Sequence, residues 1–380
     1  MIVWALWLAT AAAGGAALAA AWLRLRALGR AGRSDPPPAA WPRVSLVVPA
    51  RDEAHNLPRL LASVARLQPA PAEVIVVDDH SRDGTGDLAR AAGATVVVPP
   101  PLPAGWLGKS WACAAGAAAA TGDLLLFTDA DTVHGPASLG RAVARLEAER
   151  ADLVSVVPTH RAEVWWERLQ GAFHLLLLLA CRAGAPATRG KRRFSIGQYL
   201  LFRRDAYRRA GGHEAVRDVI AEDLALAERV VDGGGRFALV AAPGTLEVRM
   251  YPEGLAAFLR GWRRSFRDGM RAAGAGGGLE VVAAIGWLLG VPLSLAAALA
   301  LGAGPASAAW AAAYVATALI LVRAQRVVGE LPWWGPLAFP AAALAFVGVS
   351  AAAAIDHVRN APVRWRGRTV ALPGGGGGGA

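Results

Sequence analysis

The chain has 380 residues, of which 54% are hydrophobic, and it carries a net charge of +11 with only two cysteines. Its mean hydropathy of +0.35 is high for a wholly water-soluble protein, and two cysteines exclude a disulfide framework. The positive charge would suit nucleic acid or an anionic membrane. Because the arginines gather beside hydrophobic segments, we expect a membrane partner and no nucleic-acid partner.

An apolar segment opens the chain. Residues 2–22 are almost entirely apolar, which is long enough to cross a bilayer at about 1.5 Å per residue, so we predict a transmembrane helix over residues 1–23. The arginines that follow this segment predict an amino end outside the cell and a cytoplasmic continuation. Residues 24–42, with three consecutive prolines, predict a basic, proline-rich linker.

From residue 43 the pattern alternates between strands and helices. Short apolar runs predict strands at 44–48, 73–77, 95–98, 124–127 and 152–156. Between them, helices are predicted at 54–67, 86–92, 109–120 and 136–149. This alternation predicts an α/β domain with a mostly parallel sheet.

The remaining apolar segments predict contact with a membrane. Residues 165–182 are too short and too closely flanked by charge for a confident span, and they predict an interfacial helix. Residues 277–356 predict a C-terminal membrane region with two or three spanning helices. Three crossings would leave the final arginines outside, so we expect one segment to be re-entrant or interfacial. Residues 357–380 form a basic tail that ends in a glycine run.

Two carboxylates follow the apolar run Leu124–Phe127. Asp129 and Asp131 come one residue apart at the predicted end of this strand, the edge where ligands bind in open α/β sheets. Carboxylate oxygens suit Mg²⁺ or Mn²⁺ shared with a diphosphate. The alternative is an Asp-rich turn that caps the next helix.

Polar residues also follow the first two strands. Pro49, Arg51 and Glu53 come at the end of the first strand, and Asp78 and Asp79 at the end of the second. At this edge such side chains contact a base or ribose, as acidic residues do in other nucleotide folds, or they cap the next helix. Three polar strand ends in one sheet favour a ligand site.

Known phosphate-binding loops are missing from the sequence. No GxGxxG follows the first strand, which argues against a dinucleotide-binding dehydrogenase, and no complete P-loop is present. Lys109 instead opens a predicted helix, where it is placed to contact a diphosphate or a base.

Two later segments complete the candidate site. Glu222 and Asp223 open a helical stretch, and Asp223 is a plausible general base, although an acidic first turn is also favoured by the helix dipole. Arg260, Arg263 and Arg264 precede the membrane region. They suit a leaving diphosphate, or a juxtamembrane amphipathic helix.

Together these segments resemble family 2 glycosyltransferases of the GT-A fold. The motifs occur in that family's order and cover nearly all of residues 43–270: Val48–Glu53, Asp78–Thr85, Gly108-Lys109, Asp129–Asp131 and Glu222-Asp223. The flanking stretches 103–112, 197–202 and 365–368 are similar to membrane-bound enzymes that glycosylate carotenoids (diaponeurosporenoate-type) or are associated with hopanoids.

The resemblance implies a role for each matching residue. Asp79 would bind the nucleotide, with Asp78 assisting, Asp131 would ligate the metal, and Asp129 would face the nucleotide sugar or share the metal. Asp223 would be the base, with Glu222 beside it. The full set expected to bind substrate is Pro49, Arg51, Glu53, Asp78, Asp79, Lys109, Asp129, Gln198, Arg260, Arg263 and Arg264.

The implied activity is an inverting transfer of a sugar from a nucleotide diphosphate sugar, UDP-linked by resemblance alone, to a lipid hydroxyl or carboxyl. The lipid would be a carotenoid, hopanoid or other polyprenoid that enters between helix 165–182 and the C-terminal helices. We expect a multi-pass protein of the inner (plasma) membrane with a cytoplasmic catalytic domain. The alternatives are a non-catalytic nucleotide-sugar-binding membrane protein and a polysaccharide synthase. A synthase normally needs a longer membrane region, and the arginine segment lacks the tryptophan that ends the family's Gln/Arg-x-x-Arg-Trp motif.

Overall fold

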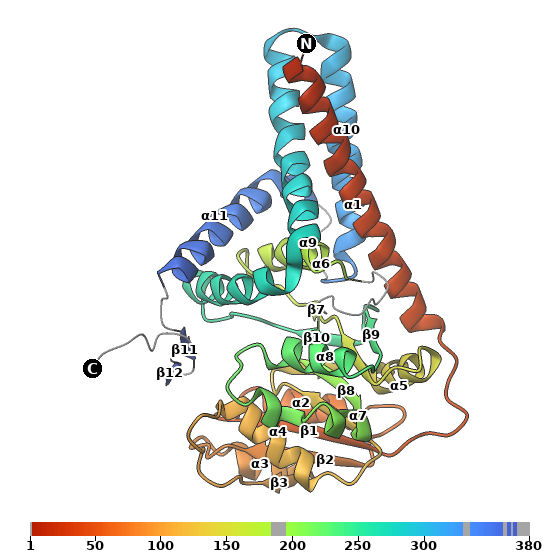
Figure 1. The fold of residues 1–380 in the computed structure, drawn as a ribbon, viewed down its shortest axis with the longest axis vertical. Coiled ribbons are helices and arrows are strands. Elements are labelled where there is room, and N and C mark those ends of the chain that lie inside the picture. Colours follow the sequence, from red (N-terminus) through yellow and green to blue (C-terminus); the bar gives the residue numbers. More distant parts are fainter. Residues whose placement is uncertain (1, 184–194, 330–334, 360–362, 366–367, 371–380) are drawn as a thin grey trace.

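The computed structural model describes residues 2–183, 195–329, 335–359, 363–365 and 368–370. It consists of an α/β body below a group of long helices (Figure 1). Most of the predicted tail with its glycine run lies outside the described residues.

A seven-stranded sheet with the order β3-β2-β1-β4-β8-β6-β9 forms the centre of the body. Its strands are β1 (Val44–Ala50), β2 (Glu73–Asp78), β3 (Thr95–Val97), β4 (Leu124–Thr128), β6 (Leu153–Val156), β8 (Tyr199–Arg203) and β9 (Phe237–Val240). Only β8 runs antiparallel to its two neighbours, β4 and β6. The prediction of an α/β fold with a mostly parallel sheet is therefore confirmed.

Helices cover both faces of the sheet, which explains why its strands are almost continuously apolar. They are α2 (Leu57–Val64), α3 (Thr85–Ala91), α4 (Gly108–Ala119), α5 (Ser138–Ala148), α7 (Arg204–Arg209) and α8 (Glu222–Asp232). Successive side chains of a strand point to opposite faces, so Leu46 packs with Leu60 and Leu139 on one face. Val47 packs with Phe127 on the other face.

A second, three-stranded sheet lies between the body and the long helices. It has the order β5-β10-β7, formed by β5 (Thr132–His134), β10 (Leu246–Val248) and β7 (Thr159–His160). Because β10 pairs with β5, the chain that follows β10 is brought close to the loop after β4. A hairpin of β11 (Val363–Trp365) and β12 (Arg368–Val370) lies near the carboxyl end.

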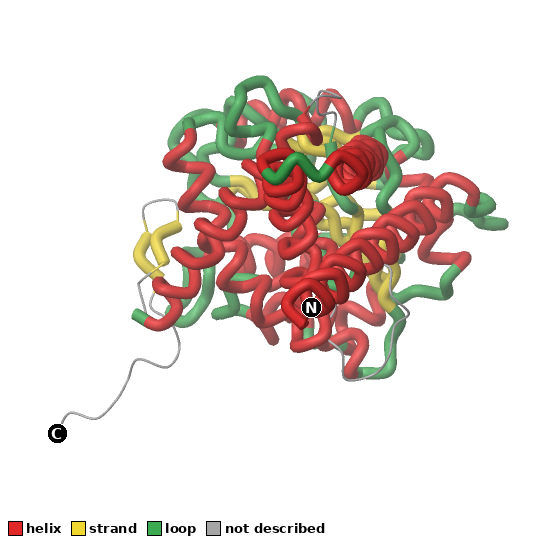
Figure 2. The backbone as a smooth tube through the Cα atoms, turned by 90° about the horizontal axis from the view of Figure 1, so that it is seen from above, coloured by secondary structure: helices red, strands yellow, loops and turns green. Residues whose placement is uncertain are grey.

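The long helices are α1 (Ile2–Ser34), α9 (Leu255–Ala300), α10 (Gly304–Gln325) and α11 (Phe339–Val358), with a 3-10 turn η2 (Gly335–Ala338) before α11. Among the described residues, three segments are long and apolar enough to cross a membrane: Gly276–Ala300, Gly304–Gln325 and Gly335–Asp356. The upper part of α9 stands beside α1 and α10, whereas α11 lies obliquely (Figure 1). Seen from above in Figure 2, α1 crosses over the body. A span at 1–23 stays a prediction.

Two predicted boundaries differ from the structure. Residues 24–34 continue α1 where a linker was predicted, because Leu25 and Leu28 are buried and Arg24 contacts Glu280 of α9 at 2.7 Å. The helix ends just before the three prolines that begin at residue 36, which disfavour helix in the residue before them. The predicted domain limit at residue 270 falls inside α9.

The predicted interfacial helix is shorter than expected. It appears as α6 (Leu169–Ala180), which lies between the body and the long helices (Figure 1). Phe173 is fully buried against aromatic rings of α9 and α11, among them Trp262 and Phe346. Its neighbour His174 turns to His160 of β7, so α6 contacts both the long helices and the body.

Candidate active site

Three polar strand ends meet at one edge of the sheet. β1 lies between β2 and β4, with Ala50 opposite Asp78 and Val47 opposite Phe127. Arg51, which follows β1, donates to the backbone oxygen of Asp79 at 3.0 Å and lies 3.3 Å from its carboxylate. Pro49 lies inside β1, past its pairing with β4. The carboxyl ends of these strands therefore form one edge, as expected for a ligand site.

The loops after β1 and β2 brace each other. The backbone N–H of Arg82 donates to Asp52 at 2.9 Å, and that of Ala54 donates to Asp83 at 2.9 Å. The buried Glu53 donates its own N–H to Thr85 at 2.9 Å. These contacts hold the two loops rigidly at the edge.

The two neighbouring aspartates of β2 have different environments. Asp78 accepts the backbone N–H of Ser81 at 2.9 Å, so it closes its own turn. Asp79 is only 4% exposed, and its Oδ1 has no hydrogen-bond partner in the described part of the chain. A buried carboxylate oxygen without a partner is costly, so Asp79 is the better placed of the two to bind a ligand.

Lys109 joins two parts of the candidate site. Its ammonium group lies 2.8 Å from Asp129, after β4, and 2.9 Å from Glu222, in the first turn of α8. Burial acts to lower the pKa of Lys109, but these two carboxylates outweigh it and hold the pKa well above its ordinary value. Lys109 is therefore a fixed positive charge between them.

Asp131 is a half-buried acid with one buried, unsatisfied oxygen. Its Oδ1 has no partner among the described residues. Burial, followed by the charges of Asp129 and Glu53, raises the pKa of Asp131 to about 7 against the opposing effect of Lys109. A hard-oxygen group in this condition fits a divalent cation. No three His, Cys, Asp or Glu side chains of the described residues gather closely enough to enclose an ion. Mg²⁺ is usually bound by one or two carboxylates together with substrate phosphates, and Asp131 and Asp129 are carboxylates of this kind.

Asp223 lies beside Lys109 at the start of α8. Burial, followed by the charge of Glu222, raises the pKa of Asp223 to about 7, although Lys109 opposes the rise. The backbone at Gly197 approaches both: a Cβ there would lie 3.3 Å from Lys109 Nζ and 3.4 Å from Asp223 Oδ2. A carboxylate with a pKa near neutrality suits proton abstraction at physiological pH.

The other predicted binding residues are spread more widely. Gln198 precedes β8, and its backbone oxygen accepts a hydrogen bond from Thr128 at 2.8 Å. Arg263 forms a bidentate ion pair with Asp356 of α11, at 2.6 and 2.8 Å, and Arg260 is exposed. Of the three arginines, Arg264 is the one whose positive charge lowers the pKa of Tyr251, a residue near Asp131.

Tyr251 is a residue of the candidate site that the sequence analysis did not identify. It follows β10 with a φ of +63°, a conformation that is unfavourable for a bulky residue. Burial raises the pKa of Tyr251, and its surrounding charges include Arg264 and Asp131. A methyl group at Gly261 of α9 would overlap the tyrosine ring. In the sequence, only a Tyr-Pro pair between a strand and the arginine segment marks this position.

Comparison with known proteins identifies the class of this site. Residues 45–211 match the model of glycosyl transferase family 2. The chain is 30% identical over 254 residues to a 4,4'-diaponeurosporenoate glycosyltransferase of Staphylococcus aureus (strain MRSA252), over 65% of this chain and 66% of the relative. It is 28% identical over 233 residues to the protein of that name from Staphylococcus haemolyticus, over 60% of this chain and 61% of the relative. The chain thus spans a little under two thirds of the length of these relatives.

A solved structure supports the fold. The mannosyltransferase PcManGT from Pyrobaculum calidifontis, in complex with GDP-Man and Mn²⁺, is 23% identical with a TM-score of 0.54, over 94% of this chain and 99% of that chain. The fold of this protein is therefore GT-A-like, with apolar helices added at its carboxyl end.

Proposed function

We propose that this protein is an inverting hexosyltransferase that moves a sugar from a nucleotide diphosphate sugar to a hydroxyl or carboxyl group of a membrane lipid. The observation that carries the proposal is the group of charges at the sheet edge. Lys109 joins Asp129 to Glu222, and Asp131 and Asp223 both have a pKa near 7 beside it. Paired acids with raised pKa values in one site are typical of catalysis.

The strand ends suit the donor. Asp79, held by Arg51, offers a buried carboxylate oxygen to the nucleoside, and Asp131 with Asp129 would hold the cation and the diphosphate. When bound, Mg²⁺ or Mn²⁺ would neutralise charge on the diphosphate. The relatives support a nucleotide-sugar donor; we take UDP-glucose as the first donor to test and GDP-mannose as the second.

Asp223 is the proposed base. For a hydroxyl acceptor, it would accept the proton of that hydroxyl as the oxygen bonds to the anomeric carbon, whereas a carboxyl acceptor is already ionised near neutral pH and would attack as the carboxylate. The bond from this carbon to the diphosphate oxygen breaks on the opposite face, and the nucleoside diphosphate leaves with the bonding electron pair. Lys109 and Arg264 would stabilise the charge that grows on the leaving group, and Tyr251 would position Arg264 beside Asp131.

A lipid acceptor fits both the relatives and the long apolar helices. The curated relatives are named for a carotenoid acid, which supports a polyprenoid acceptor with a carboxyl or hydroxyl group. We further propose a multi-pass protein of the inner (plasma) membrane with its catalytic domain in the cytoplasm. The arginines that follow the apolar residues 2–22 support that orientation.

The direct test supplies membranes that contain this protein with labelled UDP-glucose or GDP-mannose, Mn²⁺ and a polyprenoid lipid extract, and then identifies the labelled lipid by mass spectrometry. We expect one lipid product that carries one sugar. A non-catalytic binding protein would retain the nucleotide sugar and give no product, and a polysaccharide synthase would give a polymer. Either result would contradict the proposal.

A further inference from the structure

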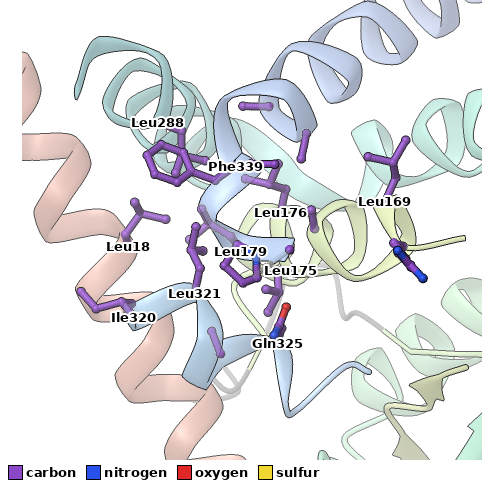
Figure 3. Close-up of a pocket in the computed structure, with 18 of the residues that line it drawn as sticks. Leu18, Leu169, Leu175, Leu176, Leu179, Leu288, Ile320, Leu321, Gln325 and Phe339 are labelled. Carbon is purple, nitrogen blue, oxygen red and sulfur yellow. The ribbon is translucent and has the colours of Figure 1, made fainter. Parts of the chain in front are cut away.

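A cavity of about 260 Å³ lies among α1, α6, α10 and α11. Figure 3 shows Leu18, Leu176, Leu321 and Phe339 around it, each from a different helix. The residues of α6 that line it lie on the face opposite Gln170 and His174, which contact the body. The cavity is therefore separated from the catalytic domain by the thickness of one helix.

The lining of the cavity selects an apolar ligand. Nearly all of its described lining is aliphatic or aromatic, and the only charged or amide side chains are those of Arg168 and Gln325. An apolar cavity of even about 150 Å³ stays dry and binds small hydrocarbons. This cavity therefore suits a hydrocarbon chain, with Arg168 and Gln325 marking its polar parts.

The position of the cavity allows entry from a bilayer. It reaches Leu288 inside the first candidate membrane span, the end of the second span at residues 320–325, and the start of the third at residues 335–343. It thus lies at the end of the apolar helices nearest the catalytic domain. A lipid chain in a surrounding bilayer would reach it without crossing water.

The turn at residues 165–168, just before α6, connects the cavity to the catalytic edge. Trp165 and Arg168 line the cavity. Between them, Trp166 donates its indole N–H to the backbone oxygen of Tyr251 at 3.3 Å, and Glu167 accepts from Arg249 at 2.9 Å. Arg249 and Tyr251, which lie in the segment near Asp131, are therefore held by the turn at residues 165–168 that also borders the cavity.

We propose that this cavity holds the hydrocarbon chain of the acceptor lipid, while the reactive end of that lipid passes the turn at residues 165–168, just before α6, to reach Asp223. The inference rests on the proposed transfer to a lipid. The occupant of the cavity is the acceptor, and not a bulk phospholipid, because the turn at residues 165–168 lines the cavity and also contacts Tyr251 near the catalytic edge. A lipid-packing role would not need that connection.

The test compares two leucines of α10. Leu321 lines the cavity, whereas Leu319 is 51% exposed and lies outside it. Leu321→Trp should raise the KM for the lipid about tenfold or more and leave the KM for the nucleotide sugar unchanged. Leu319→Trp, the matched control, should change neither. Ala172→Phe fills the cavity from α6 and provides a second variant if Leu321→Trp does not fold.

A binding measurement separates this inference from the proposed function. A diazirine-labelled isoprenoid carboxylic acid is crosslinked to the purified protein without any donor sugar, and labelled peptides are mapped by mass spectrometry. Labelling of α6 and α10 should fall several-fold in Leu321→Trp and persist in Leu319→Trp. Unlabelled isoprenoid acid should compete, whereas excess phosphatidylcholine should not.

Each failure has a different signature. An unchanged lipid KM in both filled variants would overturn the cavity assignment while transferase activity stands. Competition by phosphatidylcholine would overturn it in favour of a bulk lipid. Labelling of the cavity without sugar transfer from any donor would instead overturn the proposed function. The bound hydrocarbon chain would then not be that of an acceptor.

Discussion

At the scale of single residues, Lys109 determines how the neighbouring acids behave. It is paired with Asp129 and Glu222, so its positive charge persists across the physiological pH range. Among the acids of the candidate site, Asp131 and Asp223 have pKa values raised to about 7. The pH dependence of this protein is therefore expected to come from these two carboxyl groups.

The proposed base predicts an activity that rises with pH. The pKa of Asp223 is raised to about 7, so below this pH the group is protonated and cannot accept the acceptor proton. We expect kcat/KM to rise as the pH increases through about 7 and then to reach a plateau, measured with saturating Mn²⁺ between pH 5 and 9. A profile that is flat over this range would rule out Asp223 as the base.

Replacing the base tests the same residue directly. Asp223→Asn keeps the size of the side chain but removes its basicity, and we expect kcat to fall by about 10²-fold or more. Binding of the nucleotide sugar, measured by calorimetry, should change little. Asp87→Asn in the exposed first turn of α3 is the matched control and should keep full activity. Normal activity in Asp223→Asn would show that another group serves as the base.

Asp131 is expected to lower the stability of the metal-free protein and to allow metal binding. The pKa of Asp131 is about 7 in the fold, against an ordinary value of 3.8, so the folded state loses stability as pH rises between these values. Without added metal, Asp131→Asn should raise the melting temperature at pH 8 by at least about 2 °C. Mn²⁺ should stabilise the wild-type protein and not the variant in thermal unfolding. Equal stabilisation of both by Mn²⁺ would place the cation elsewhere.

At the scale of elements, α9 supports the catalytic edge through its contact with Tyr251. Gly261 leaves room for the tyrosine ring, whereas Gly286, further along α9, has open space around it. Gly261→Ala should therefore displace Tyr251 and lower kcat/KM severalfold, with a loss of stability of about 1–3 kcal/mol. Gly286→Ala should leave activity unchanged and favour the helix slightly. Activity and thermal unfolding of the two variants measure the difference.

The elements themselves show where sequence reasoning succeeded. The central strands were predictable because strands covered on both faces are continuously apolar, as in Leu124–Phe127. The short strands β5, β7 and β10 were not, because two or three residues carry no usable periodicity. In the central sheet, β9 went unpredicted, and so did β8, although the apolar run of β8 at Tyr199–Phe202 is as clear as that of β4. The antiparallel pairing of β8 depends on where the chain returns to the sheet.

At the scale of the whole molecule, α1 is anchored to α9 and to the chain after α6. Glu280 of α9 pairs with Arg24 of α1 at 2.7 Å and with Arg182 at 2.8 Å. Higher up, a Cβ at Gly14 would lie 2.6 Å from Trp287 Cβ. Close approach of helices at glycine is typical of membrane interfaces, so α1 packs as part of the helical group that also forms the cavity.

This packing predicts a difference between two glycines. Gly14→Leu should separate α1 from α9, lower the melting temperature in detergent and weaken labelling of the cavity by the isoprenoid probe. Gly348→Leu, at an α11 position with open space, is the control and should change neither quantity. If both variants behave like the wild type, α1 does not contribute to the cavity.

The sequence by itself determined the class of fold, the acidic strand ends and the apolar helices, because these depend on local periodicity and on the order of short motifs. Only the tertiary structure decided which charges meet. It pairs Arg263 with Asp356, brings Tyr251 toward Asp131, and extends α1 to Ser34, into the first part of the predicted linker. These outcomes depend on contacts between segments far apart in the chain, where packing and charge pairing outweigh local preference.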